Sequence, residues 1–182
     1  GGFVTSYTDI TERKRAEAEI LRLLAEQQLI FDNAHVGIVW VKQRKIVRCN
    51  QRLVEMFQFS EPDSRIGQST RILYQSDAQW DDVGSGMYLD LEHLGSSQAE
   101  YSMQRADGSS IRVMLTGRPI DQGKVHEGSI WVYTDVTMRY RQEAELRLAE
   151  NVFAHTSEAL LVTDSAGVIV HVNQAFPVLT AL

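Results

Sequence analysis

The first half of the chain opens with two short apolar runs, Val36–Lys42 and Lys45–Cys49, which are separated by the polar pair Gln43-Arg44. Runs of this length joined by so tight a turn predict a β-hairpin. Asn50 follows at once and is a good N-cap, so a short helix is expected over Gln51–Phe57, with its apolar side chains facing inward.

The second half changes from a helical to an alternating period at Gly95. Before it, apolar residues recur at helical spacing over Asp77–Leu94, which predicts the longest helix of the central region. After it, Ser97–Arg105 and Ser110–Ile120 alternate on either side of an Asp-Gly pair, the usual signal of a hairpin turn. Gly128–Thr134 is a last strand. This order predicts an α+β fold, an antiparallel sheet with helices on one face.

An internal repeat sets the domain organisation. The matching segments are Gly2–Arg13 with Gly128–Arg139, Val36–Val41 with Glu158–Thr163, and Ile46–Gln51 with Ile169–Gln174. The chain is therefore expected to hold one complete module between parts of two others. The predicted parts are the last strand of an upstream module (1–11), a linker helix (12–29), the complete module (30–137), a second linker helix (138–150) and the start of a downstream module (151–182).

The first linker helix is expected to begin at a capping box formed by Asp9 and Glu12. Its residues at coiled-coil spacing are Arg13, Ala16, Ile20, Leu23, Gln27 and Ile30. Two interpretations stay open. The helix could lie on its own domain as an amphipathic linker, or it could form a parallel coiled coil in a homodimer, which would also use the domain surface.

Composition narrows the function classes. The formal charge of −6 and the lack of a basic tract argue against nucleic-acid binding. The single cysteine, Cys49, fits a reducing compartment, and the apolar runs are far short of a bilayer span. We expect a cytoplasmic region without direct membrane insertion. The missing initiator Met suggests that it begins inside a larger polypeptide, whose anchor could lie elsewhere.

In this order and spacing the elements resemble a PAS domain of the bacterial sensor type. The resemblance rests on Asn33–Asn50, Gly67-Gln68, Asp107-Gly108-Ser109, Gly117-Arg118-Pro119 and Gly128–Thr137. It implies a five-stranded antiparallel sheet of order 2-1-5-4-3, with helices enclosing a small cavity. It also implies that a signal passes through a D-[IV]-T junction into a helix that feeds an output domain, such as a histidine kinase, a diguanylate cyclase or a phosphodiesterase. The residues expected to transmit it are Asp9, Thr11, Asp135, Thr137 and Arg139.

The residue types decide between possible cofactors. A flavin photoreceptor of this family needs a cysteine in the helix that corresponds to Gly67–Leu73, which has none. The position for a haem-ligating histidine falls at Gly84, and His93 lies within a turn of the helix end, so haem is not favoured. A non-covalent flavin stays open. No histidines or carboxylates are paired at metal spacing, and no nucleophile motif occurs, so neither a metal site nor an enzyme is predicted.

A small-molecule pocket is a further expectation. The candidate residues, all predicted to point inward, are Trp40, Phe57, Tyr74, Trp80, Met87, Tyr101, Met103 and Trp131. Three functions remain open on the sequence: a sensory and signal-relay module, a dimerisation or spacer module that binds nothing, and a flavin- or haem-dependent sensor.

Overall fold

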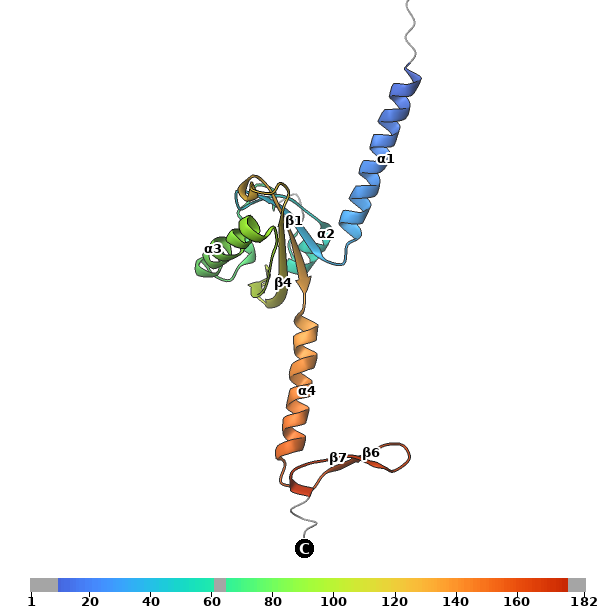
Figure 1. Ribbon diagram of the computed structural model, residues 1–182, viewed down its shortest axis with the longest axis vertical. Helices are drawn as coiled ribbons and strands as arrows, with labels where there is room; N and C mark the ends of the chain where they lie inside the picture. The colour runs from blue at the N-terminus through green and yellow to red at the C-terminus, as the bar shows by residue number, and fades with distance from the viewer. Residues whose placement is uncertain (1–9, 61–64, 177–182) are drawn as a thin grey trace, which may run out of the picture. The chain divides into compact units, whose positions relative to one another are not determined.

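The central sheet of the computed structural model has five antiparallel strands in the order β2-β1-β5-β4-β3 (Figure 1). The strands are β1 Gly37–Lys42, β2 Lys45–Cys49, β3 Ser97–Gln104, β4 Ser110–Pro119 and β5 Ser129–Asp135. The structure describes residues 10–60 and 65–176. The last strand lies in the middle of the sheet, with Trp131 opposite Val39 on one side and Gly117 on the other. The expected strand order is therefore confirmed.

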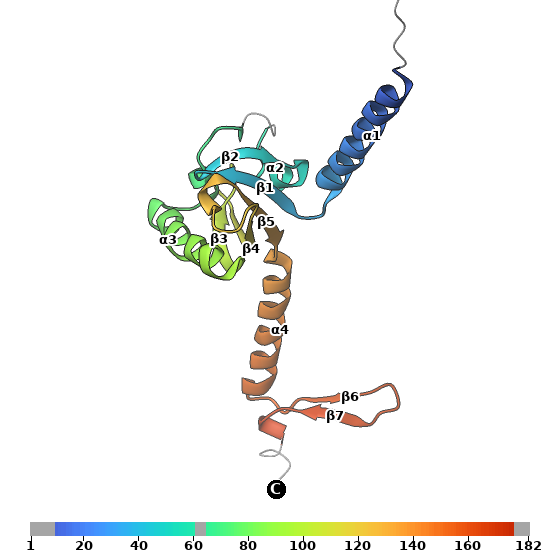
Figure 2. The same cartoon turned by 45° about the horizontal axis from the view of Figure 1, so that its top comes forward.

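Helices cover one face of this sheet. The helical elements that follow β2 are α2 Gln51–Phe57, η2 Thr70–Leu73, α3 Asp77–Leu94 and η3 Val125–Glu127. Helix α2 packs against β1, and α3 packs against β3 and β4 (Figure 2). Alternate strand residues such as Val39, Val113 and Leu115 meet the apolar sides of both helices in one buried cluster. The predicted bounds of α2 and α3 are confirmed, and Gly95 ends α3 with a φ of +71°.

Asn50 holds the start of the domain together. Its Oδ1 accepts hydrogen bonds from Ile38 N at 2.8 Å and from Leu53 N at 3.1 Å. Its Nδ2 donates to Phe31 O at 2.9 Å and to Val36 O at 3.0 Å. The predicted N-cap is thus confirmed. The same fully buried side chain also joins β1 to helix α1 (Thr11–Asn33), because Phe31 O is one of the carbonyls that a helix C-terminus leaves unpaired.

Both long helices outside the sheet begin without a side-chain cap. Helix α1 has Ile10 at its N-cap position, and α4 (Thr137–His155) has Val136, neither of which can accept a hydrogen bond through its side chain. Thr137 is already the first helical residue of α4 and therefore does not occupy its N-cap position. The proposed cap Asp9 lies outside the described residues.

The second compact unit starts at residue 136 and contains α4 and a hairpin of β6 Leu161–Thr163 and β7 Ile169–Val172. In this hairpin Asn173 Oδ1 accepts from Leu160 N at 2.9 Å, and Asn173 Nδ2 donates to Glu158 O at 2.7 Å. Asn50 makes the same bonds to Ile38 and Val36. Both hairpins also shift register at the same step of their first strand, between Trp40 and Val41 in one and between Val162 and Thr163 in the other.

Gly117 allows a close approach between two strands of the sheet. A Cβ at this position would lie 2.6 Å from Cζ3 of Trp131, whose indole is almost fully buried. We expect Gly117→Ala to lower the free energy of unfolding by about 1–3 kcal/mol, because the ring must move within a packed core. Urea denaturation followed by tryptophan fluorescence would measure the change.

The matched control is Gly86→Ala on α3, where an added Cβ would meet nothing within 4 Å. The higher helix propensity of alanine should make this variant neutral or stabilise it by up to about 1 kcal/mol. Equal destabilisation by both substitutions would contradict the packing argument.

In the described part of the chain, no helix is long and apolar enough to cross a lipid bilayer.

Candidate functional site

A small cavity lies between the sheet and the helices. Its volume is about 10 Å³, room for roughly one water molecule. Its lining combines three apolar side chains, Val41, Val83 and Trp131, with five that carry hydrogen-bonding groups, Arg44, Thr70, Tyr74, Tyr88 and Tyr133. A cavity with so many polar groups differs from an ordinary packing defect, which is apolar.

The three tyrosines stay protonated at neutral pH. Burial is the main cause that raises the pKa of Tyr74, Tyr88 and Tyr133 above the ordinary value for a phenol. The hydroxyls of Tyr74 and Tyr133 are hydrogen-bonded to each other, and that of Tyr88 is bonded to Ser129. The cavity therefore presents neutral hydroxyl groups, although one hydroxyl of the Tyr74–Tyr133 pair already donates to the other.

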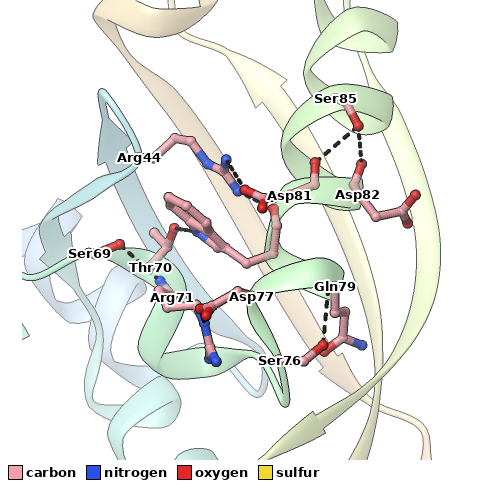
Figure 3. A network of polar contacts seen from close by, with 11 residues as sticks. Arg44, Ser69, Thr70, Arg71, Ser76, Asp77, Gln79, Asp81, Asp82 and Ser85 are labelled. Atoms are coloured by element: carbon pink, nitrogen blue, oxygen red, sulfur yellow. Dashed lines mark hydrogen bonds and ion pairs between the residues drawn. The ribbon is translucent and has the colours of Figure 1, made fainter.

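Arg44 forms the charged wall of this cavity. It belongs to the tight turn between β1 and β2, where both turn residues have positive φ, 50° at Gln43 and 59° at Arg44. Figure 3 shows its side chain reaching toward Asp81 at the beginning of α3. The guanidinium carbon lies 3.4 Å from the centroid of the Trp80 ring, and Nη2 donates to Trp80 O. This stacked arrangement holds a cation beside the cavity.

Neighbouring elements fix the position of Arg44. Thr70 N donates to Arg44 O at 2.9 Å, and Trp80 Nε1 donates to Thr70 Oγ1 at 3.0 Å. Gly84 leaves the space for the guanidinium, because a Cβ there would lie 2.3 Å from Arg44 Nη1. The turn, η2 and α3 together therefore hold one side chain in place.

The candidate pocket residues divide into three groups. Tyr74 and Trp131 line the cavity, and Trp80 stacks on its arginine. The others on the inner face contribute to the core or pack against it without lining the cavity; these are Phe57, Met87, Tyr101 and Met103. Trp40 is 39% exposed on the opposite face of the sheet, so the prediction that it points inward is wrong. The buried positions of β1 are Gly37, Val39 and Val41, which leaves the even-numbered residues outside.

The opposite face carries an apolar groove of about 550 Å³. Its walls come from β1 and β5, from Ile120, and from the end of α1; the lining residues are Gln27, Ile30, Phe31, Ala34, Ile38, Trp40, Arg48, Ile120, Ile130 and Val132. Arg48 closes one side by stacking over the Phe31 ring, 4.4 Å from its centroid. An exposed hollow with so apolar a lining is typical of an interaction surface.

The junction at the end of β5 is tied to the helical layer by Arg105. This residue follows β3, and its Nη2 lies 3.5 Å from Oδ2 of Asp135, the last residue of β5. Its Nε donates to Met56 O in the last turn of α2 at 2.9 Å. This ion pair gives Asp135, one of the residues expected to transmit the signal, a contact with a cation outside its own strand. Of the other residues in the predicted transmission set, Thr137 and Arg139 lie in the first turn of α4, and Thr11 is the first residue of α1.

The cavity does not fit a flavin or haem in its present form, because bound cofactors of that size need several hundred Å³. Cys49 is buried in the core cluster, away from the cavity lining. Among the described residues, no group of three histidine, cysteine or carboxylate side chains is arranged to hold a metal ion.

The sequence did not single out Arg44, Tyr88, Tyr133 or Arg105 as site residues. Tyr133 could have been found, because it shares the inward face of β5 with Trp131, two residues away. A glycine in the middle of a predicted helix, Gly84, was a second available signal, since it often marks close packing. Nothing in the sequence indicates that the arginine of a polar turn bends inward.

Comparison with known proteins agrees with this architecture. Residues 35–138 match the family described as PAS domain. Over 122 residues the chain is 32% identical to the sensor protein TdiS of Thauera aromatica, an alignment that covers 66% of this chain and 22% of TdiS. The chain thus spans about a fifth of the length of that curated relative.

Two solved structures show the same fold. The PAS domain of a LuxR-family transcriptional regulator from Burkholderia thailandensis, in complex with ethanol, is 26% identical with a TM-score of 0.57, covering 60% of this chain and 96% of that one. A PAS domain from Colwellia psychrerythraea is 21% identical with a TM-score of 0.58, covering 64% and 99%. With the match over residues 35–138, the strand order and the enclosed cavity, the chain belongs to the PAS domain family.

Proposed function

We propose that this PAS domain is the sensory and signal-relay module of a multi-domain bacterial regulator of the histidine kinase or cyclic di-GMP type. The observation that carries the proposal is the Arg105 bridge, which joins the last turn of α2 to Asp135 at 2.9 and 3.5 Å. Helix α2 packs on the cavity side of the sheet, and Asp135 is followed directly by the residues that start α4. Movement of α2 would therefore reach the exit helix through one side chain.

The match to the sensor protein TdiS supports this role. Any catalytic output would lie in another part of the parent protein, and we propose a cytoplasmic location for this region.

A ligand-free spacer is the second candidate, favoured by the small volume of the cavity. A flavin or haem sensor would first require the cavity to open.

We further propose the tandem organisation predicted from the sequence, with a second PAS module beginning at residue 151. The support is Asn173, which repeats the hydrogen bonds of Asn50, and the register shift at the same step of both hairpins. Two independent features of backbone geometry are thus shared by segments that also match in sequence. The upstream counterpart over residues 1–11 lies mostly outside the described residues.

Arg105→Ala tests the relay. Without the bridge, the start of α4 loses its link to α2. We therefore expect the amides from Tyr140 onward in the first turns of α4 to exchange with deuterium about threefold to tenfold faster. Hydrogen–deuterium exchange read by mass spectrometry would measure the rates. Asp135→Ala should give the same result, and the double variant no more than either alone, because both remove one link.

The control is Arg112→Ala, which removes another arginine–carboxylate pair of the sheet, Arg112 with Glu100 at 3.8 Å, and leaves both Arg105 and Asp135 in place. Exchange in α4 should be unchanged in this variant. If Arg105→Ala also leaves α4 unchanged, signal transfer through the Arg105–Asp135 bridge is excluded.

A further inference from the structure

The charge of Arg44 is only weakly compensated by its surroundings. Asp81 provides the nearby carboxylate, but its Oδ1 is 3.9 Å from Nη1 and its side chain is mostly exposed. Such a pair at the surface contributes little. Within the described part of the chain, the buried Nε of Arg44 has no hydrogen-bond partner. A buried donor without a partner is unfavourable and rare, which indicates that an acceptor belongs there.

Among the described residues, the cavity lining supplies further hydroxyl groups and no carboxylate. Three phenol hydroxyls and the Thr70 hydroxyl line it together with Arg44, and no described carboxylate is among the lining residues. Its volume accommodates one oxygen-sized group. The site is therefore complementary to a single negatively charged oxygen.

A surface groove gives the rest of a ligand somewhere to lie. It has a volume of about 250 Å³ and is lined by Gly84, Ser85, Tyr88, Leu89, Glu92 and His126. Tyr88 lines both hollows, and Gly84, against which the Arg44 guanidinium packs, lines the groove. The one carboxylate on the groove, Glu92, faces His126 Nε2 at 3.7 Å. The groove adjoins the charged cavity but is itself partly apolar, through Leu89 and the Tyr88 ring.

We propose that this site binds a small organic carboxylate, with one carboxylate oxygen in the cavity against Arg44 and the remainder of the molecule in the groove beside Tyr88 and Leu89. This inference rests on the proposed sensory function and specifies the chemical class of its ligand. Arginine suits the role because a hydrogen bond from a guanidinium to a carboxylate oxygen is charge-assisted and about twice as strong as a neutral one. The Arg44–Trp80 stack must adjust when the ligand enters, which connects binding to the start of α3.

The test compares acids with their uncharged amides at equal size. Propionate, butyrate and benzoate, each as the sodium salt, are titrated against propionamide, butyramide and benzamide by isothermal calorimetry, with sodium chloride as the ionic-strength control. At least one acid should bind about tenfold or more tightly than its amide. Arg44→Gln should remove this preference, and Arg44→Lys should keep part of it.

Gly84→Ala gives a second variant that leaves Arg44 in the sequence. The new Cβ displaces the guanidinium, so carboxylate affinity should fall, while Gly86→Ala, two residues away, should bind like the original protein. Circular dichroism and the melting temperature show that each variant is folded.

Three results would overturn the proposal. The amides could bind as tightly as the acids, or Arg44→Gln could bind the acids with unchanged affinity. The third is that no acid binds with a dissociation constant of about 10 mM or below, which is on the order of the weakest specific binding. Amide binding would refute the carboxylate class and leave the sensory function standing. The relay through Arg105 is measured without any ligand, so its failure is seen separately.

Discussion

Replacing Asn50 with alanine is expected to lower the free energy of unfolding by about 3 kcal/mol or more, one of the two largest effects predicted for this chain. The side chain is fully buried and makes four hydrogen bonds, with Ile38 N, Leu53 N, Phe31 O and Val36 O. Alanine leaves these backbone groups without partners in a site that water cannot readily reach. Each unsatisfied buried group costs about 1–3 kcal/mol, although the costs do not simply add.

Urea denaturation would give the loss of stability, and hydrogen exchange would show whether the last turn of α1 opens when Phe31 O loses its donor. Asn50→Asp should be nearly as harmful at neutral pH, because it replaces two donated hydrogen bonds with a negative charge facing two carbonyl oxygens.

Asn173→Ala is the matched control, since it removes the same kind of bonds from the hairpin of the second unit. It should leave the main unfolding transition unchanged. A loss below about 1 kcal/mol for Asn50→Ala would show that water or neighbouring side chains can replace the amide.

The fold could be predicted from the sequence because its signals are local. The two-residue turn at Gln43-Arg44, the Asn50 cap and the glycine that ends α3 each fix the backbone of a few residues. The position of the last strand, β5, in the middle of the sheet was predicted only from the resemblance to the PAS family. Strand order itself depends on contacts between residues far apart, so local patterns alone would have left it open.

The site could be predicted only in part. On β1 the alternation fails as a guide, because Ile38 and Trp40 outside are as apolar as Val39 and Val41 inside. Both faces of β1 meet apolar surroundings, so the sequence could not show to which side of the sheet Trp40 points. Arg44 was hidden for the opposite reason, since a charged residue in a turn is normally solvated, and only the space at Gly84 allows it to lie inside.

The second large predicted effect concerns the apolar groove that Trp40 lines. We expect Trp40→Glu to abolish self-association of the chain at micromolar concentration, because we propose that the groove receives helix α1 of a second copy. Helix α1 is 23 residues long with no buried residue, and it exposes Ile20, Leu23 and Leu24. A helix of this composition is marginal without a packing partner.

Charge complementarity supports the same occupant. Arg48 lines the groove, and Lys42 and Arg118 are exposed on the same face of the sheet. Between residues 16 and 27, α1 carries Glu17, Glu19 and Glu26 against one basic residue, Arg22; Glu17 and Glu26 each form an exposed ion pair with an arginine of α1. The leucine-rich middle of α1, which is acidic over residues 16–27, and an apolar groove with basic neighbours fit a helix-in-groove interface.

Sedimentation equilibrium would measure the dissociation constant. Loss of a central tryptophan contact costs about 2–4 kcal/mol, which weakens association by about 30-fold to 1,000-fold, and a buried glutamate adds to the loss. Ile130→Glu, on the neighbouring strand that lines the groove, should weaken self-association to a similar extent. Leu89→Glu on α3 introduces the same charge at an exposed apolar residue elsewhere and should leave the dimer intact. A protein that is monomeric before any substitution, or a dimer that survives Trp40→Glu, would rule out this face as the interface between copies.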